Sequence, residues 1–277
     1  MIDRSMIGGE METTVSKDGT TIAFAESGSG PAVILVAGAF GYQVFGPNVG
    51  LVPLLAEHFR AVLYDRRGRG DSGDTQPFQR VREVDDLDAV IKAVGGSAFV
   101  YGISSGAALA AEAASALGPE RITKLAMYEP SYILDDTHAP VPSTYLPRLR
   151  ELLAEGRRGD MVALFLTEAV GMPAEMVEAM GPFPPAMEQV AHTLLYDGAF
   201  MVDNQQGRMT ADLRGTLEAI RVPTIVIDGG ATFPFLHNTA DIVGKTIRGA
   251  RRHTVEGQLH DVAPEAIAPV LVQFLQE

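Results

Sequence analysis

The stretch that organises this chain lies at residues 98–117 and reads AFVYGISSGAALAAEAASAL. Its first four residues form an apolar run suited to a buried strand, and residues 107–117 favour a helix. Between them, Gly102 and Gly106 flank Ser104 in a Gly-x-Ser-x-Gly turn. The turn must be tight, because side chains two residues before and after the serine would collide. A serine at the apex of a strand-turn-helix unit is the context of the nucleophile-elbow motif.

The motif predicts a chemical position for Ser104. We expect a strained backbone that lifts its Oγ off the sheet edge into a pocket. The N-terminus of the following helix would lie beneath it and favour developing negative charge. An ordinary glycine-rich turn is the alternative, but the surrounding strand and helix favour a nucleophile.

Composition restricts the possible functions. Of the 277 residues, 46% are hydrophobic and 21% are charged, as expected for a globular chain with a sizeable core. No apolar run approaches the roughly 20 residues of a membrane span, and residues 1–10 read as a loose leader without a signal peptide. We therefore expect a cytoplasmic protein that does not associate with membranes.

The charge and the residue types present also exclude several partners. A net charge of -13 argues against nucleic acid. Cysteine is absent, so disulfides and thiolate nucleophiles are excluded. His, Asp and Glu show no metal-ligand spacing, and we expect no metal and no cofactor. The expected partner is a small-molecule substrate, and a homodimer is possible.

Strands and helices alternate through most of the chain and predict a doubly wound, mostly parallel sheet. The pattern breaks between about 131 and 220, where prolines separate short helical stretches and Met and Phe residues accumulate. We predict a helical cap at residues 132–215, between two parts of an α/β core at 1–131 and 216–277. The Met and Phe content suits an adaptable apolar pocket over Ser104, although ordinary helix packing would also explain it.

Two glycine-rich segments follow predicted strands. The turn at residues 37–41 could expose backbone N–H groups as an oxyanion hole, but this segment alone favours an ordinary strand-end turn. The loop at residues 65–73 carries three arginines together with Asp65 and Asp71. We interpret this loop as a salt-bridged turn rather than a phosphate clamp.

These features together make the chain resemble an α/β-hydrolase with a cap domain over essentially its whole length. The resemblance rests on four segments in this order: Gly38-Ala39-Phe40-Gly41, Asp65-Arg66-Arg67-Gly68-Arg69-Gly70-Asp71-Ser72, Gly102 to Gly106, and His260 before the last helix. It implies the α/β-hydrolase fold and a Ser-acid-His triad in that chain order.

The resemblance implies a role for individual residues. Ser104 would be the nucleophile and His260 the general base, since it is the histidine in the loop after the last predicted strand. Backbone N–H groups of Ala39 and Ser105 would form the oxyanion hole. The family often has His-Gly where this chain has Ala37-Gly38, which weakens the transfer of any specific activity.

The acid departs from the usual pattern, because its ordinary place falls near Thr232, which has no carboxylate. Glu129, after the strand that follows the elbow, and Asp228, at the end of the next-to-last strand, remain as candidates. Asp261 is a poor candidate because it neighbours the histidine in sequence. We predict that Glu129 holds Nδ1 of His260, with Asp228 as the alternative.

The expected function is that of a serine hydrolase acting on a carboxylic ester or lactone of a small to medium apolar molecule. Serine at 104 disfavours epoxide hydrolase and dehalogenase chemistry, which require a carboxylate nucleophile. Thioester, C–C bond and perhydrolytic reactions use the same machinery and stay open. A non-hydrolytic ligand-binding protein of the same fold is the alternative from another class, and the absence of an acid at the usual place is its support.

Overall fold

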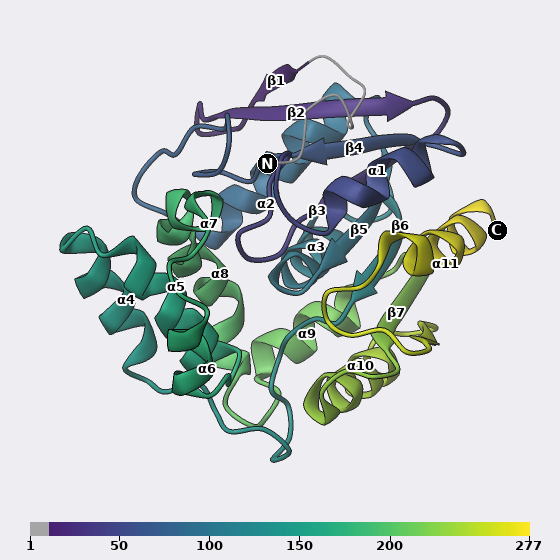
Figure 1. Cartoon of the computed structure of the whole chain (residues 1–277). Helices are drawn as coiled ribbons and strands as arrows, with labels where there is room; N and C mark the ends of the chain where they lie inside the picture. Colours follow the sequence, from purple (N-terminus) through teal and green to yellow (C-terminus); the bar gives the residue numbers. More distant parts are fainter. Residues whose placement is uncertain (1–10) are drawn as a thin grey trace.

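The computed structural model describes residues 11–277, and eight strands within this range form one sheet in the order β1-β2-β4-β3-β5-β6-β7-β8 (Figure 1). The pairs β1–β2 and β2–β4 are antiparallel, and all other neighbours are parallel. The strands are β1 (Glu12–Val15), β2 (Thr21–Gly28), β3 (Ala32–Val36), β4 (Arg60–Tyr64), β5 (Ala98–Ile103), β6 (Ile122–Tyr128), β7 (Thr224–Gly229) and β8 (Arg251–Val255). The predicted mostly parallel, doubly wound sheet is confirmed.

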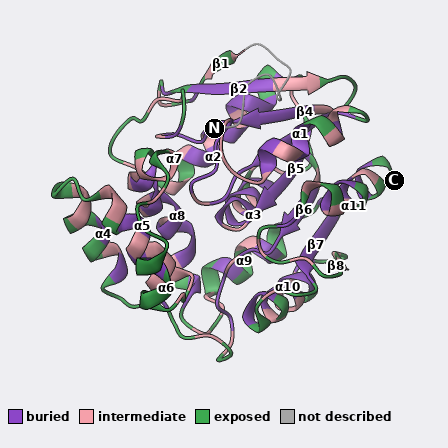
Figure 2. Ribbon diagram, in the orientation of Figure 1, coloured by how far each residue is buried: buried purple, intermediate pink, exposed green. Residues whose placement is uncertain are grey.

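Helices cover both faces of the sheet. The core helices are α1 (Asn48–Ala56), α2 (Arg80–Ala93), α3 (Ser105–Leu117), α9 (Ala211–Ala219), α10 (Pro234–Thr246) and α11 (Pro264–Gln276). Buried side chains of α2, α3 and α9 form one apolar cluster with the sheet, and those of α1 and α11 form a second cluster. The central strand β3 is buried at all five positions, which explains its continuous run of apolar residues (Figure 2).

The long insertion between β6 and β7 contains short helices and lies beside the carboxyl ends of the parallel strands (Figure 1). It contains α4 (Tyr145–Ala154), α5 (Arg158–Leu164), α6 (Ala174–Ala179), α7 (Pro185–Gln189) and α8 (Leu194–Met201), with a π-helical turn at Phe165–Ala169 and 3₁₀ turns at Ala191–Thr193 and Val202–Asn204. An isolated parallel bridge joins Ile133 and Gln205. The predicted cap at residues 132–215 falls in this insertion, and its C-terminal boundary lies inside α9, whose buried residues join the core.

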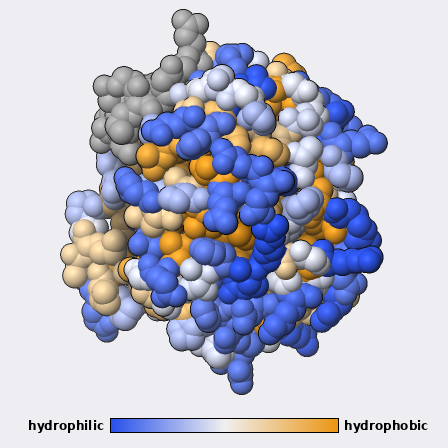
Figure 3. All heavy atoms as spheres, turned by 90° about the vertical axis from the view of Figure 1, so that its right-hand side faces the viewer, coloured by the Kyte–Doolittle hydropathy of each residue, from blue (hydrophilic) through white to orange (hydrophobic). Residues whose placement is uncertain are grey.

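The N-terminal part of the described chain forms the antiparallel edge of the sheet. The turn that contains Asp18 and Gly19 joins β1 and β2 as a hairpin. Residues 1–10, read from the sequence as a loose leader, lie outside the described residues. None of the helices in the described part of the chain is long and apolar enough to cross a membrane. On the face shown in Figure 3, hydrophilic residues predominate and hydrophobic ones gather in smaller areas between them.

Candidate active site

Ser104 lies at the junction of β5 and α3 with the strained backbone expected of an elbow. Its φ is 57° and its ψ is −126°, in the left-handed half of conformational space. A Cβ at Gly102 would lie 2.5 Å from the carbonyl oxygen of Gly106, and a Cβ at Gly106 would lie 2.4 Å from that of Val36. Both glycines are therefore required by close backbone approach, and the elbow predicted from sequence is present.

The turn after β3 lies directly against the elbow. A Cβ at Gly38 would approach Cβ of Ser104 to 3.0 Å, and Ala39 and Ser105 line the same pocket as Ser104. The N–H of Ser105 opens helix α3, where the first N–H groups have no acceptor within the helix. The two candidate oxyanion-hole residues therefore flank the candidate nucleophile.

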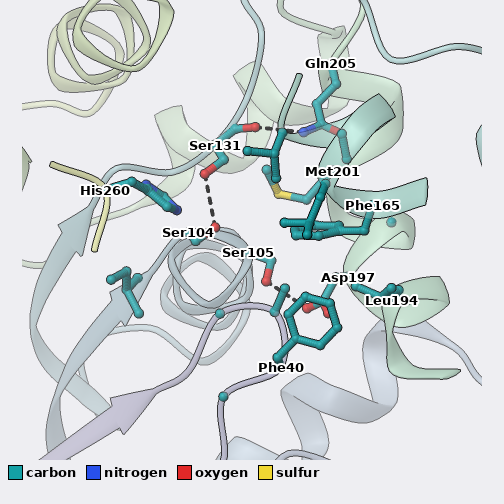
Figure 4. Close-up of a pocket in the computed structure, with 18 of the residues that line it drawn as sticks. Phe40, Ser104, Ser105, Ser131, Phe165, Leu194, Asp197, Met201, Gln205 and His260 are labelled. Carbon is teal, nitrogen blue, oxygen red and sulfur yellow. Dashed lines mark hydrogen bonds between the residues drawn. The ribbon is translucent and has the colours of Figure 1, made fainter. Parts of the chain in front are cut away.

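His260 lies in the loop between β8 and α11, and its side chain is 39% exposed. Its Nδ1 lies 2.6 Å from Oε2 of Glu129, a distance typical of a short hydrogen bond. The imidazole ring points towards Ser104 (Figure 4), and both residues line the pocket. The contact predicted between His260 and Glu129 is therefore present.

Glu129 follows β6 and is completely buried. Its Oε1 accepts the N–H of Gly229 at 2.8 Å, and its Oε2 accepts the hydroxyl of Thr232 at 3.1 Å in addition to His260. Its φ is 42°, a left-handed conformation that is unusual for a residue with a side chain. Thr232, which occupies the place where the family usually has its acid, thus holds the carboxylate that reaches the site from another strand.

Asp228 does not reach His260 and has partners of its own. Its carboxylate accepts the hydroxyl of Thr254 at 2.9 Å, pairs with Arg252 at 3.1 Å, and contacts Nδ1 of His237. The side chain is fully buried at the end of β7. These contacts give Asp228 a structural role, and the geometry favours Glu129 between the two candidates.

Ser131 contacts the candidate nucleophile, and the sequence did not single it out. Its Oγ lies 3.0 Å from Oγ of Ser104 and donates to the carbonyl oxygen of Glu129 at 3.1 Å (Figure 4). The backbone carbonyl of Ser131 in turn accepts Nε2 of Gln205 at 2.9 Å. Either hydroxyl can donate in the contact between Ser104 and Ser131, so Ser131 lies close enough to hydrogen-bond the candidate nucleophile.

The pocket above Ser104 has a volume of about 440 Å³ and walls that are mostly apolar. Its apolar side chains come from the β3 turn, the cap and the start of α10, and include Phe40, Phe165, Leu166, Met187, Leu194, Met201, Phe233, Phe235 and Leu236. Among the cap methionines, Met187 and Met201 line the pocket, whereas Met176 and Met180 are exposed. Only some of the Met and Phe residues in the cap therefore line the cavity.

The arginines of the loop after β4 are buried and paired, as the interpretation of a salt-bridged turn requires. Their carboxylate partners, however, come from other elements rather than from Asp65 and Asp71. Arg66 pairs with Glu83 and Asp197, Arg67 pairs with Asp18 and Asp86, and Arg69 pairs with Asp197. Asp65 instead accepts the backbone N–H groups of Gln43 and Asp71.

Asp197 is a second pocket residue that the sequence analysis missed. It lies on α8 with an exposure of only 4%, lines the pocket, and accepts the hydroxyl of Ser105 at 2.7 Å. Burial favours the neutral carboxyl, but Arg69 and Arg66 outweigh it and lower the pKa of Asp197 below its ordinary value. The available signal was a single carboxylate in the otherwise uncharged segment Leu194–Met201.

Comparison with known families agrees with this arrangement. The sequence model described as "Alpha/beta hydrolase family" matches residues 33–268. The chain belongs to the alpha/beta hydrolase family. A solved alpha/beta hydrolase from Sphaerobacter thermophilus DSM 20745 is 50% identical with a TM-score of 0.87, and the match covers 95% of this chain and 100% of that one. Within residues 11–277 of this family member, no group of three His, Asp or Glu side chains could hold a metal ion.

More distant relatives share the fold or a segment. A thermophilic esterase from Thermogutta terrifontis is 19% identical with a TM-score of 0.71, over 96% of this alpha/beta hydrolase and 98% of the esterase chain. The "Probable oxidoreductase EphD" of Mycobacterium tuberculosis (strain ATCC 25618 / H37Rv) is 44% identical in an alignment over 81 residues that covers 27% of this chain. The matched segment spans only 13% of that protein's length.

Proposed function

We propose that this alpha/beta hydrolase is a serine hydrolase that cleaves a carboxylic ester or lactone of a small to medium apolar molecule. The observation that carries the proposal is the hydrogen bond of 2.6 Å between Nδ1 of His260 and a fully buried Glu129, beside a serine on a strained elbow. A carboxylate on Nδ1 holds the imidazole so that its other nitrogen can accept a proton. This contact supports hydrolysis over the alternative of a non-hydrolytic binding protein, whose basis was the absence of an acid at the usual place.

The acylation step follows from this geometry. Serine is a weak nucleophile until a base removes its proton. On substrate binding, the hydroxyl of Ser104 turns from Ser131 to Nε2 of His260, which takes the proton as Oγ attacks the carbonyl carbon. Glu129 stabilises the imidazolium, and His260 then protonates the departing alcohol. In deacylation, His260 takes a proton from water as the water oxygen attacks the acyl carbon, and the intermediate then collapses to release the carboxylic acid while His260 returns the proton to Oγ of Ser104.

The oxyanion of the tetrahedral intermediate would lie against the N–H groups of Ala39 and Ser105. Both residues border the pocket next to Ser104, and both N–H groups belong to the backbone, so the replacement of the usual His-Gly by Ala37-Gly38 leaves the donors in place. Such preorganised donors contribute a large part of the rate enhancement in acyl transfer.

The pocket supports an apolar substrate of limited size. A volume of about 440 Å³ lies within the range of sites that hold drug-sized ligands. Phenylalanine, leucine and methionine side chains form most of the wall, which favours an apolar acyl or alcohol group. Among substrates that this chemistry allows, esters and lactones require only the groups described here.

The proposal is tested with p-nitrophenyl esters of two to eight carbons and a parallel panel of lactones and acyl thioesters. We expect wild-type turnover of the esters or lactones and labelling of Ser104 by a fluorophosphonate. Ser104→Ala should lower kcat at least about 10³-fold with an unchanged melting temperature, because the variant lacks the hydroxyl that forms the acyl-enzyme. Variant activity within tenfold of wild type, or folded wild-type protein that is neither active nor labelled, would contradict the proposal.

A further inference from the structure

The backbone of the candidate oxyanion hole is held by two buried arginines. Nη1 of Arg69 donates to the carbonyl oxygens of Gly38 and of Gly41, and Nη1 of Arg66 donates to that of Ala37 at 3.1 Å. The carbonyl of Gly38 and the N–H of Ala39 belong to one planar trans peptide, so the N–H points away from Arg69. The guanidinium group thus fixes the direction of this N–H.

Both arginines are themselves held by one carboxylate from the cap. Nη2 of Arg69 lies 2.9 and 2.8 Å from the two carboxylate oxygens of Asp197, and Nη1 of Arg66 lies 2.7 Å from Oδ1. The same Oδ1 accepts the hydroxyl of Ser105, the residue whose N–H is the second donor. Figure 4 shows Asp197 beside Ser105, at the wall of the pocket. One cap carboxylate therefore reaches both halves of the oxyanion hole.

From these contacts we propose that Asp197 is a positioning residue of the oxyanion hole, which couples the seating of the cap on the core to stabilisation of the transition state. The inference rests on the proposed hydrolysis. Asp197 acts through Arg69, Arg66 and Ser105, and the groups that contact the developing oxyanion are the N–H groups of Ala39 and Ser105.

The charges of the cluster explain why Asp197 is required. Arg66 has a second carboxylate partner in Glu83, which it contacts through Nε and Nη2 at 2.7 and 2.8 Å. Asp197 is the carboxylate that Arg69 contacts, and the other three bonds of Arg69 go to Gly38, Gly41 and the hydroxyl of Thr193. Without Asp197, a guanidinium that is 1% exposed would lack its counter-charge. Arg69 would then shift towards water and release the Gly38 peptide.

The test compares Asp197→Asn with Asp74→Asn. Asp74 is a matched control because it also links the core to helix α8, through the hydroxyl of Tyr196 at 2.8 Å, and its contacts are with Gln76, Tyr196 and His192 rather than with the oxyanion-hole residues. The readouts are kcat and KM with p-nitrophenyl butyrate, the inhibition constant of a trifluoromethyl ketone that forms a tetrahedral adduct on Ser104, and the melting temperature.

We expect Asp197→Asn to lower kcat about 10- to 100-fold, less than the complete loss of an oxyanion donor, with KM within about threefold of wild type. The affinity for the ketone should fall in the same proportion, because the adduct carries the oxyanion. Asp74→Asn should change kcat and the inhibition constant less than about threefold. A purely structural role would lower the melting temperature of both variants and leave kcat and ketone affinity of the folded protein intact.

Unchanged kcat and ketone affinity in folded Asp197→Asn would overturn the inference, as would a change confined to KM. If that variant does not fold, Arg69→Lys decides, because lysine keeps a charge beside Asp197 but cannot hold Asp197 and the Gly38 carbonyl in a fixed fork. Its kcat and ketone affinity should fall together, and wild-type values would overturn the inference. An inactive wild-type protein overturns the proposed function and this inference, whereas an active wild type with unaffected variants overturns the inference alone.

Discussion

Glu129 combines a left-handed backbone with a carboxylate whose two oxygens both have partners. Its φ of 42° costs conformational energy, which surrounding contacts must offset. The N–H of Gly229 and the hydroxyl of Thr232 bind the carboxylate and leave one direction of Oε2 for His260. The conformation therefore orients the side chain towards the histidine, as expected for strain at a functional position.

Replacing this carboxylate separates the two acid candidates. Glu129→Gln should lower kcat by about 10³- to 10⁴-fold, because an amide at Nδ1 favours the wrong imidazole tautomer. Asp228→Asn, the control, should leave kcat within about threefold and lower the free energy of unfolding by about 1–3 kcal/mol, since Arg252 loses its buried partner. Kinetics and thermal melting of the two variants check this, and the reverse pattern would assign the acid to Asp228.

Substitution of Thr232 should also lower kcat, but less than substitution of Glu129. Thr232→Val removes the hydroxyl that donates to Oε2 of Glu129 at 3.1 Å and keeps the shape of the side chain. We expect kcat to fall about three- to tenfold, in line with one hydrogen bond to a charged group. Thr254→Val removes the equivalent hydroxyl from Asp228 and should leave kcat unchanged. Equal kinetics for the two variants would show that Thr232 has no part in orienting Glu129.

At the scale of elements, we expect a glycine-to-alanine substitution to destabilise the protein at the elbow and to stabilise it in helix α9. Gly106→Ala should lower the free energy of unfolding by about 3 kcal/mol or more, because the new Cβ would lie 2.4 Å from the carbonyl oxygen of Val36. Gly215→Ala, within α9, meets nothing within 4 Å and should raise stability by about 0.5–1 kcal/mol. Urea unfolding measures both changes. A stable Gly106→Ala protein would contradict the close approach at the elbow.

Elements of the core were predictable because each has a local signal. Strand β3 is buried along its whole length and reads as an uninterrupted apolar run, and α3 follows a turn that only glycine can make. In the cap, α5 is followed directly by a π-helical turn, Phe165–Ala169. Phe165 and Leu166 of this turn line the pocket. Such an irregularity is set by packing over the site, and no local pattern encodes it.

At the scale of the whole molecule, the sequence predicts those residues of the candidate site that stand at motif positions of the family. Ser104 and His260 occupy such positions, and Glu129 follows a predicted strand next to the elbow. Ser131 and Asp197 stand at no such motif position, and their contacts form only when distant parts of the chain pack together. Asp197 lies 128 residues from Arg69, and a pairing over that distance has no sequence signal beyond an isolated charge.

The stability of the folded chain in acid depends in part on Asp18, in the turn between β1 and β2. Burial raises the pKa of Asp18, but hydrogen bonds from Thr20 and Arg67 outweigh it and lower the pKa to about 2. The folded state then binds the proton less tightly than the unfolded chain, whose pKa is near 3.8. The stability that Asp18 contributes is therefore complete above about pH 4 and is lost as the pH falls through 2.

The corresponding experiment is thermal melting of wild type and Asp18→Asn between pH 6 and pH 2. We expect the wild type to melt at the higher temperature above pH 4 and the two curves to converge as the pH falls towards 2. A difference that stays constant over the whole range would contradict a lowered pKa for Asp18.

The position of Glu129 before the insertion bears on how this alpha/beta hydrolase could be recombined. Four of the candidate site residues, Ser104, Glu129, Ala39 and Ser105, precede residue 132, so a cap taken from a homologue would leave their spacing in the sequence unchanged. The replacement cap must nevertheless provide a carboxylate at the position of α8 that faces Arg66 and Arg69. A cap without this carboxylate would leave a buried guanidinium group without its counter-charge and lower the free energy of unfolding by several kcal/mol. Chimeras that change substrate range should therefore be selected from donors with an acidic residue at this point of contact.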